Sequence, residues 1–192
     1  MRYIILAGTS YDPPRQLTVV RGEVLIERTI RLLKENGVED IVISSPNPAF
    51  DKYGRLDYDG RASWMDCFPP IEEPTCFVFG DVYFSPEAIK KIVETETDTI
   101  EFFASAPPFA PGYPKRWAEP FAFKVCDVEH FKWAVEKTKE NRHLFRRPPI
   151  AWELWQVIKG TPINHIDYTN YTVINDYTCD VDTPEDADQW KF

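Results

Sequence analysis

The chain has 192 residues, 43% of them hydrophobic, which suffices for one well-filled core and would be crowded for two independent domains. Its 22 basic and 31 acidic residues give a net charge of −9 without a long basic stripe, which argues against a protein that wraps nucleic acid. The 4 cysteines lack C-x-x-C spacing, so neither a zinc site nor a disulfide framework is expected. The opening apolar run is too short for a secretory or membrane segment, and we expect a cytoplasmic protein.

The first part of the chain reads as a β-loop-α-β unit. Residues 3–7 form a continuous apolar run that ends at Gly8, as expected for a strand covered on both faces of a parallel sheet. A polar loop over residues 9–16 follows. Apolar residues at helical spacing predict a helix over 23–36, ended by a glycine, and residues 38–44 predict a second strand. Such a unit is typical of α/β sheets with right-handed crossovers.

The remainder of the chain continues the alternation of strands and helices. Further strands are predicted over residues 75–79, 100–103, 121–125 and 168–174. Helices are predicted to start at Ser85 and Thr183 and to span 127–141 and 150–158. Ser85 and Thr183 are each followed by proline, which favours the first position of a helix after a hydroxyl cap. We therefore predict one α/β domain over residues 1–192, with a central, mostly parallel sheet and helices on both faces.

Two carboxylates stand at corresponding places in this pattern. Asp81 follows a buried strand and precedes a helix start, and Asp182 lies just before the helix start at Thr183. One fold could therefore bring both acids to the same edge of a sheet, where they could share a hard cation. For either acid alone a structural role is the simpler interpretation, because Asp81 could cap a turn and Asp182 could merely precede a helix.

Several short motifs occur at both ends and in the middle of the chain. They are Leu6-Ala7-Gly8, Pro14-Arg15-Gln16-Leu17, the segment from Gly22 to Ile41, Gly80-Asp81, and D-x-D-T-P-E-D over residues 180–186. Their combination resembles the nucleotidyltransferases of the molybdopterin-guanylyltransferase and sugar-phosphate cytidylyltransferase type, although each motif alone is a weak signal. The resemblance implies a single-domain Rossmann-like (GT-A-like) α/β/α sandwich.

The resemblance also implies a reaction and its cofactor. Such enzymes transfer a nucleoside monophosphate from a nucleoside triphosphate to a small phosphorylated acceptor, here a sugar or alcohol phosphate, and release pyrophosphate. The catalytic residues would be Arg15, Asp81 and Asp182. Mg²⁺ would be held by Asp81 and Asp182, with Asp180 as the reserve ligand.

The nucleotide-binding residues that the resemblance assigns are Leu6, Ala7, Gly8, Thr9, Gly60 and Ser63. The loop after Gly8 would surround the phosphates with backbone N–H groups. Arg15 occupies the position of a lysine in the family, which keeps the charge and changes the geometry. This loop departs from the family because it is shorter and lacks the second glycine and the arginine of G-x-G-x-R.

The acceptor side has several alternative interpretations. The resemblance places the acceptor phosphate near Lys115, Arg116, Trp117, Glu119 and Pro120, of which Lys115, Arg116 and Glu119 are the predicted acceptor-binding residues. A second basic cluster of Arg142, Arg146 and Arg147 could bind its phosphate or form a solvated helix end. The aromatic residues Trp152, Trp155 and Tyr168 could line a sugar-binding wall or face the core.

Two rival functions remain open at this point. A glycosyltransferase on the same sheet would also use a strand-end aspartate and a divalent ion, with a nucleotide sugar as donor. A degenerate relative that binds nucleotide or another protein without turnover would suit the shortened Gly8 loop. The expected partners are a nucleoside triphosphate and a small phosphorylated acceptor, and the sequence is also compatible with a homodimer.

Overall fold

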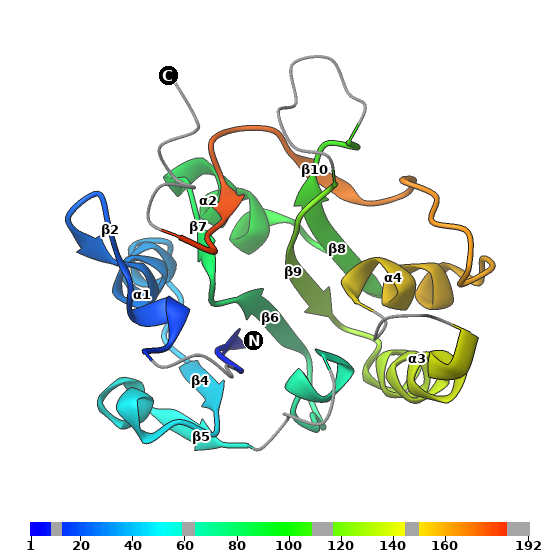
Figure 1. The fold of residues 1–192 in the computed structure, drawn as a ribbon, viewed down its shortest axis with the longest axis horizontal. Coiled ribbons are helices and arrows are strands. Elements are labelled where there is room, and N and C mark those ends of the chain that lie inside the picture. Colours follow the sequence, from blue (N-terminus) through cyan, green and yellow to red (C-terminus); the bar gives the residue numbers. More distant parts are fainter. Residues whose placement is uncertain (9–12, 59–63, 109–116, 145–149, 184–192) are drawn as a thin grey trace.

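The computed structural model describes residues 1–8, 13–58, 64–108, 117–144 and 150–183, and its centre is a seven-stranded sheet (Figure 1). The strands are β1 (Arg2–Leu6), β4 (Ile41–Ser45), β5 (Arg55–Asp57), β6 (Thr75–Phe79), β8 (Ile100–Ser105), β9 (Pro120–Val125) and β10 (Thr172–Ile174). Their order is β10-β8-β9-β6-β1-β4-β5. Every pair is parallel except those that β9 makes with β6 and β8. The predicted α/β fold with a mostly parallel central sheet is confirmed.

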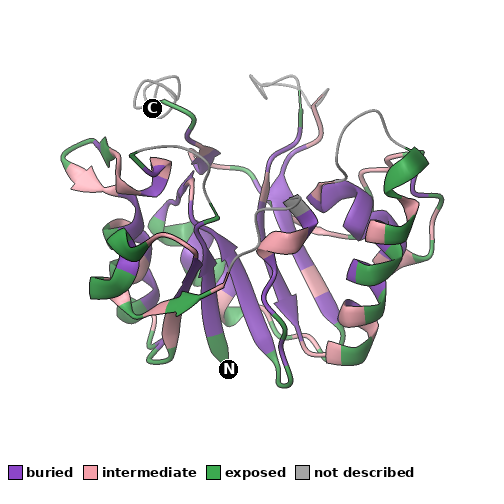
Figure 2. Cartoon of the chain, turned by 60° about the horizontal axis from the view of Figure 1, so that its bottom comes forward, coloured by how far each residue is buried: buried purple, intermediate pink, exposed green. Residues whose placement is uncertain are grey.

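Within the described residues four α-helices flank the sheet, whose central strands are buried while the edge strand β5 is largely exposed (Figure 2). The helices are α1 (Leu25–Glu35), α2 (Pro86–Glu94), α3 (Val128–Glu140) and α4 (Ala151–Lys159). No helix within the described residues is long and apolar enough to cross a membrane.

The neighbouring side chains of Phe123 and Lys124 show which helices cover which face, because successive residues of a strand point to opposite faces. The ring of Phe123 lies 6.0 Å from that of Phe131 in α3 and stacks at 4.4 Å on Phe102, which in turn contacts Trp152 of α4. Lys124 points the other way and donates hydrogen bonds to two carbonyls at the C-terminal end of α2. Since α1 packs against α2, the helices cover both faces, as predicted.

Several predicted boundaries are corrected by the structure. The helix expected over 23–36 begins at Leu25, because β3 (Glu23–Val24) pairs with β2 (Val19–Val20) in a hairpin. The strand expected over 38–44 begins at Ile41, since the N–H of Val38 still bonds back to the helix at Leu33. The strand expected over 168–174 is shortened to β10. The helix expected after Thr183 lies outside the described residues.

Other elements were not predicted because they are too short to show a period. They are β5, β7 (Val82–Tyr83), β11 (Cys179–Asp180) and the 3-10 helices η1 (Arg15–Leu17), η2 (Pro48–Tyr53), η3 (Trp64–Cys67) and η4 (Asn141–Leu144). The predicted serine cap is confirmed, because Ser85 Oγ accepts a hydrogen bond of 2.9 Å from the N–H of Ala88 at the start of α2.

Gly80 directly follows β6 and lies against the carboxyl end of the neighbouring parallel strand β1. Its N–H donates a 2.9 Å hydrogen bond to the carbonyl of Leu6. A Cβ at this position would lie 2.6 Å from that carbonyl oxygen and 3.1 Å from the side chain of Gln16. Only glycine therefore allows the two strand ends to approach this closely, immediately before Asp81.

We expect Gly80→Ala to lower the free energy of unfolding by about 1–3 kcal/mol, because the added methyl group meets backbone rather than a flexible side chain. Urea denaturation measures this change. The matched control is Gly8→Ala, whose Cβ would lie at an ordinary 3.7 Å from Cys67 Cβ. Equal stability of the Gly80 and Gly8 variants would contradict the close-packing argument.

Candidate active site

A short antiparallel pair brings the two carboxylate-bearing segments together. Strand β7 follows Asp81 directly, and strand β11 precedes Asp182. Asp180 of β11 stands opposite Val82 of β7, and the N–H of Val181 donates a 2.8 Å hydrogen bond to the carbonyl of Asp81. Because Asp81 follows β6, the pair lies at the carboxyl edge of the parallel strands, where α/β sheets place their ligands.

Arg15 completes the group of three predicted catalytic residues. Helix η1 places it at this edge, and its Nη1 forms an ion pair with Oδ1 of Asp182. The same guanidinium acts on Asp81, because it lowers the pKa of that carboxyl group. The structure therefore gathers Arg15, Asp81 and Asp182 into one cluster, which we call the acid pair with its arginine.

The carboxyl group of Asp81 has a raised pKa. Burial is the largest cause, the negative charge of Asp182 raises the pKa further, and Arg15 offsets part of the effect. Burial also raises the pKa of the Cys67 thiol, followed by the charge of Asp81. Cys67 lies against Gly8 as well, so the end of β1, the end of η3 and Asp81 meet at one place. No sequence signal marked Cys67 as part of this site.

A small hydrophobic core, separate from the main core, packs around β7 and β11, the two strands next to the acid pair. It consists of Val20, Leu25, Tyr83, Cys179 and Val181, all buried. The Arg28 side chain covers this small core, with its guanidinium carbon 4.3 Å from the ring centroid of Tyr83 and its Nε bonded to the carbonyl of Phe84. Strands β7 and β11 are thus held by apolar contacts and a cation–π contact in addition to their hydrogen bonds.

Gln16 is a further polar residue at this edge. It is 3% exposed, and its Oε1 has no hydrogen-bond partner among the described residues. Its side chain lies against Gly80, next to Asp81. Gln16 belongs to the Pro14–Leu17 motif, but no role was predicted for it from the sequence.

A cavity of about 300 Å³ begins at Asp180, and we call it the Asp180 pocket. Its lining residues are Trp117, Ala118, Glu119, Pro120, Ile150, Trp152, Ile166, Tyr168 and Asp180. It contains the predicted acceptor residue Glu119 and two of the three predicted wall residues, Trp152 and Tyr168. The third, Trp155, faces the core, where its ring packs at 5.5 Å on Phe102 and its Nε1 bonds to the carbonyl of Thr169. Trp117 and Pro120, which the resemblance placed in the same acceptor region as Glu119, also line the pocket.

Of the other predicted ligand-binding residues, some are described by the structure and some are not. Leu6 and Ala7 are buried at and after the end of β1, and Gly8 follows them as an exposed residue. The remaining candidates lie outside the described residues and comprise Thr9, Gly60, Ser63, Lys115, Arg116, Arg146 and Arg147. Arg142 is described, in η4.

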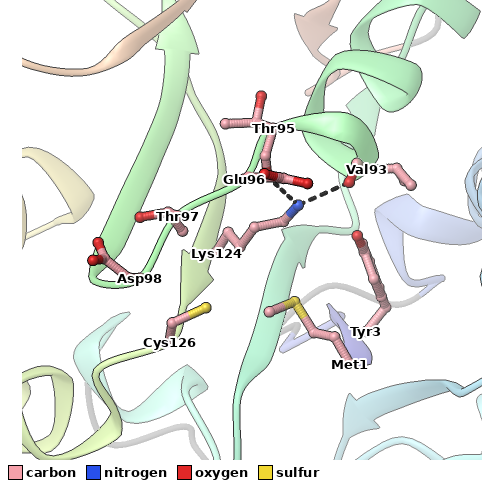
Figure 3. Close-up of a pocket in the computed structure, with 9 residues that line it drawn as sticks. All are labelled: Met1, Tyr3, Val93, Thr95, Glu96, Thr97, Asp98, Lys124 and Cys126. Atoms are coloured by element: carbon pink, nitrogen blue, oxygen red, sulfur yellow. Dashed lines mark hydrogen bonds between the residues drawn. The ribbon is translucent and has the colours of Figure 1, made fainter.

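A larger cavity, of about 670 Å³, lies at the opposite edge of the sheet (Figure 3). Lys124 is its central feature and donates hydrogen bonds of 2.9 Å and 2.7 Å to the carbonyls of Val93 and Thr95. These contacts cap the carbonyl end of α2, which is a structural task. Because none of Arg15, Asp81 and Asp182 lines this larger cavity, it is separate from the acid pair.

Comparison with known proteins assigns the fold. No protein family and no curated protein matches the sequence. Among solved structures, the chain shares its fold with two enzymes. One is the inositol-1-phosphate CTP transferase from T. maritima, with a TM-score of 0.59, 15% identity, and coverage of 96% of this chain and 90% of that chain. Another is the 4-diphosphocytidyl-2C-methyl-D-erythritol synthase from Anaerococcus prevotii, with a TM-score of 0.61, 14% identity, and coverage of 98% and 94%.

The raised pKa of Asp81 predicts that this carboxylate costs stability in the metal-free protein. At pH 7 its ionised form is less favourable in the folded than in the unfolded chain, and the cost disappears as the pH falls through the raised pKa. We expect Asp81→Asn to raise the melting temperature of the metal-free protein at pH 7 by at least about 2 °C. The gain should shrink as the pH is lowered, which calorimetric melting at several pH values would show.

The control for this experiment is Asp182→Asn. The side chain of Asp182 is 55% exposed and its ion pair with Arg15 is at the surface, so the melting temperature should change by less than about 1 °C. A destabilised Asp81→Asn variant at pH 7 would show that the buried carboxylate is fully compensated by its surroundings.

Proposed function

We propose that this protein is a Mg²⁺-dependent nucleotidyltransferase that moves a nucleoside monophosphate from a nucleoside triphosphate to a small phosphorylated acceptor. The observation that carries the proposal is the meeting of Arg15, Asp81 and Asp182 at the carboxyl edge of the sheet. Of two solved structures with this fold, one is described as a CTP transferase and the other as the synthase of a diphosphocytidyl compound, so CTP is the first donor to test.

The residues at this edge fit a magnesium ion. Within the part of the chain that the structure describes, no three His, Cys, Asp or Glu side chains form a metal-binding cluster. The donor set is instead a pair of carboxylates, and Mg²⁺ is usually bound by one or two carboxylates together with substrate phosphates. The charge of Asp182 acts on Asp81, and Gln16 Oε1, which has no hydrogen-bond partner in the described part of the chain, adds a hard oxygen nearby. Asp81 and Asp182 would hold the ion, which would supply neutralisation of the triphosphate charge.

The chain's own groups would act mainly by position and charge. An oxygen of the acceptor phosphate forms a bond to the α-phosphorus, and the bond from that phosphorus to the oxygen bridging to the β-phosphate breaks. Pyrophosphate leaves with the bonding electron pair. Since the attacking oxygen is already anionic, no general base is needed, and Arg15 would stabilise the negative charge that accumulates at the phosphorus. Backbone N–H groups after Gly8 would orient the phosphates.

Pyrophosphate release tests the proposal and separates it from its rivals. Mixing the protein with CTP, Mg²⁺ and a phosphorylated alcohol should release one pyrophosphate for each nucleotide transferred. A glycosyltransferase would release none and would consume a nucleotide sugar. A protein that only binds nucleotide would show Mg²⁺-dependent heat of binding by calorimetry but no product.

We expect Asp81→Ala to lower the transfer rate at least about a hundredfold while the protein stays folded, because the more buried of the two metal-binding carboxylates is lost. Pyrophosphate release measures the rate, and circular dichroism checks the fold. Asp98→Ala, at the opposite edge of the sheet, is the control and should keep full activity. Near-full activity of Asp81→Ala would remove this aspartate from the site.

Arg15→Ala should reduce kcat about 10- to 100-fold with a smaller change in KM for the triphosphate, since the guanidinium would act chiefly on charge that develops during transfer. Arg15→Lys should recover part of the rate, because lysine keeps the charge and loses the forked geometry. Unchanged steady-state kinetics of Arg15→Ala would contradict this role.

A further inference from the structure

Two glutamines are buried in the part of the chain that the structure describes, and their carboxamide groups differ in what they bind. Gln156 of α4 donates from its Nε2 to the carbonyls of Trp152 and Asp167. Its Oε1 accepts a 2.9 Å hydrogen bond from Thr161 Oγ1. Gln16 is 3% exposed, and its Oε1 accepts no hydrogen bond from any described residue. A buried acceptor without a donor lowers the stability of a fold, so Gln16 indicates a task beyond folding.

Gln16 reaches the acid pair from a different side than Arg15. Successive residues of a 3-10 helix point about 120° apart, so η1 directs these two neighbours differently. Arg15 pairs with Asp182, whereas the Gln16 side chain lies against Gly80, where an added Cβ would be 3.1 Å from Gln16 Cγ. Gly80 directly precedes Asp81, and Oε1 is two bonds beyond Cγ. The oxygen without a donor therefore lies beside the acid pair.

The backbone donors around Gln16 are already used by other acceptors. The N–H of Gly80 donates to the carbonyl of Leu6. Within and after η1, the N–H groups of Leu17 and Thr18 donate to the carbonyls at the start of the same turn. None of these groups is left for Gln16 Oε1, so its donor has to come from a molecule that binds at this edge.

We propose that Gln16 is a positioning residue for the divalent ion of the acid pair, and that its Oε1 accepts a hydrogen bond from a water molecule of the ion's hydration shell. The inference rests on the proposed function and adds a residue to its ion site. Mg²⁺ loses its waters reluctantly, so an ion held by Asp81 and Asp182 keeps several of them as hydrogen-bond donors. A neutral amide oxygen attracts the ion less than a carboxylate does, which suits it to this outer position.

Mn²⁺ is the probe for this role, because it prefers the same oxygen ligands as Mg²⁺ and its free form is counted by electron paramagnetic resonance. Gln16→Met keeps an unbranched side chain and removes the oxygen. We expect it to weaken Mn²⁺ binding about tenfold, with or without CTP, which is the usual effect of losing a partner of the metal ligands. Gln16→Glu restores an acceptor oxygen and should recover the affinity. Gln156→Met is the matched control and should bind Mn²⁺ like the natural sequence.

Thermal melting of the metal-free protein gives a second readout that separates positioning from a structural role. Gln16→Met removes an oxygen without a donor, so its melting temperature should be equal to that of the natural sequence or higher by up to about 3 °C. Gln156→Met leaves the partners of a satisfied carboxamide unpaired and should melt at least about 4 °C lower. A structural role of Gln16 predicts the opposite pattern, with lower melting and unchanged Mn²⁺ affinity, and that pattern would overturn the inference.

The outcomes also separate this inference from the proposed function. Pyrophosphate release that depends on Asp81, together with equal Mn²⁺ affinity of Gln16→Met and the natural sequence, would overturn the role of Gln16 and leave nucleotidyl transfer standing. Such equality is also the result expected if solvent water alone satisfies Oε1. Mn²⁺ binding that depends on Gln16, without any pyrophosphate release, would support the ion site and count against the enzymatic proposal. A protein that binds no Mn²⁺, with or without CTP, would overturn the inference.

Discussion

The candidate site depends on the antiparallel pairing of β7 and β11. These strands come from the middle and the end of the described chain, and each is only two residues long. Their hydrogen bonds fix the register in which Asp180 stands opposite Val82 and the N–H of Val181 reaches the carbonyl of Asp81. Such a short pair is not stable alone, so the buried side chains of the small core have to hold it. The position of one acid relative to the other is therefore decided by apolar packing beneath them.

The charges at this edge act in opposite directions on the stability of the fold: the buried Asp81 carboxylate lowers it, and Arg15 offsets part of that cost. Burial and the second carboxylate raise the pKa of Asp81, while Arg15 lowers it and also pairs with Asp182. One guanidinium thus interacts with both acids. Ligand sites commonly retain charges that the fold alone would not select, because those charges are needed when a ligand is present. The close approach of strand ends at Gly80 fixes the backbone on which Asp81 is carried.

The amino-acid sequence was sufficient to predict the helices and strands whose apolar residues form a long run or a clear helical period. The buried strands, the helix capped by Ser85 and the convergence of the Asp81 and Asp182 segments were predictable from apolar runs, caps and motifs. The antiparallel direction of β9 was not, since an apolar run carries no information on direction. Two-residue strands such as β7 and β11 are too short for any periodic signal. The Asp180 pocket was only partly foreseen, because it assembles Trp117, Trp152 and Asp180 from distant parts of the chain.

The separation of the small core from the main core has a consequence for motion. Hydrophobic contacts that are not shared with the rest of the interior can be broken without unfolding it, so the β7–β11 region can open locally at a lower free-energy cost than the central sheet. Any ligand that bridges the acids would close this region and slow the exchange of its backbone amides with solvent. The part of the molecule that handles the ligand would then also be the part whose order the ligand controls.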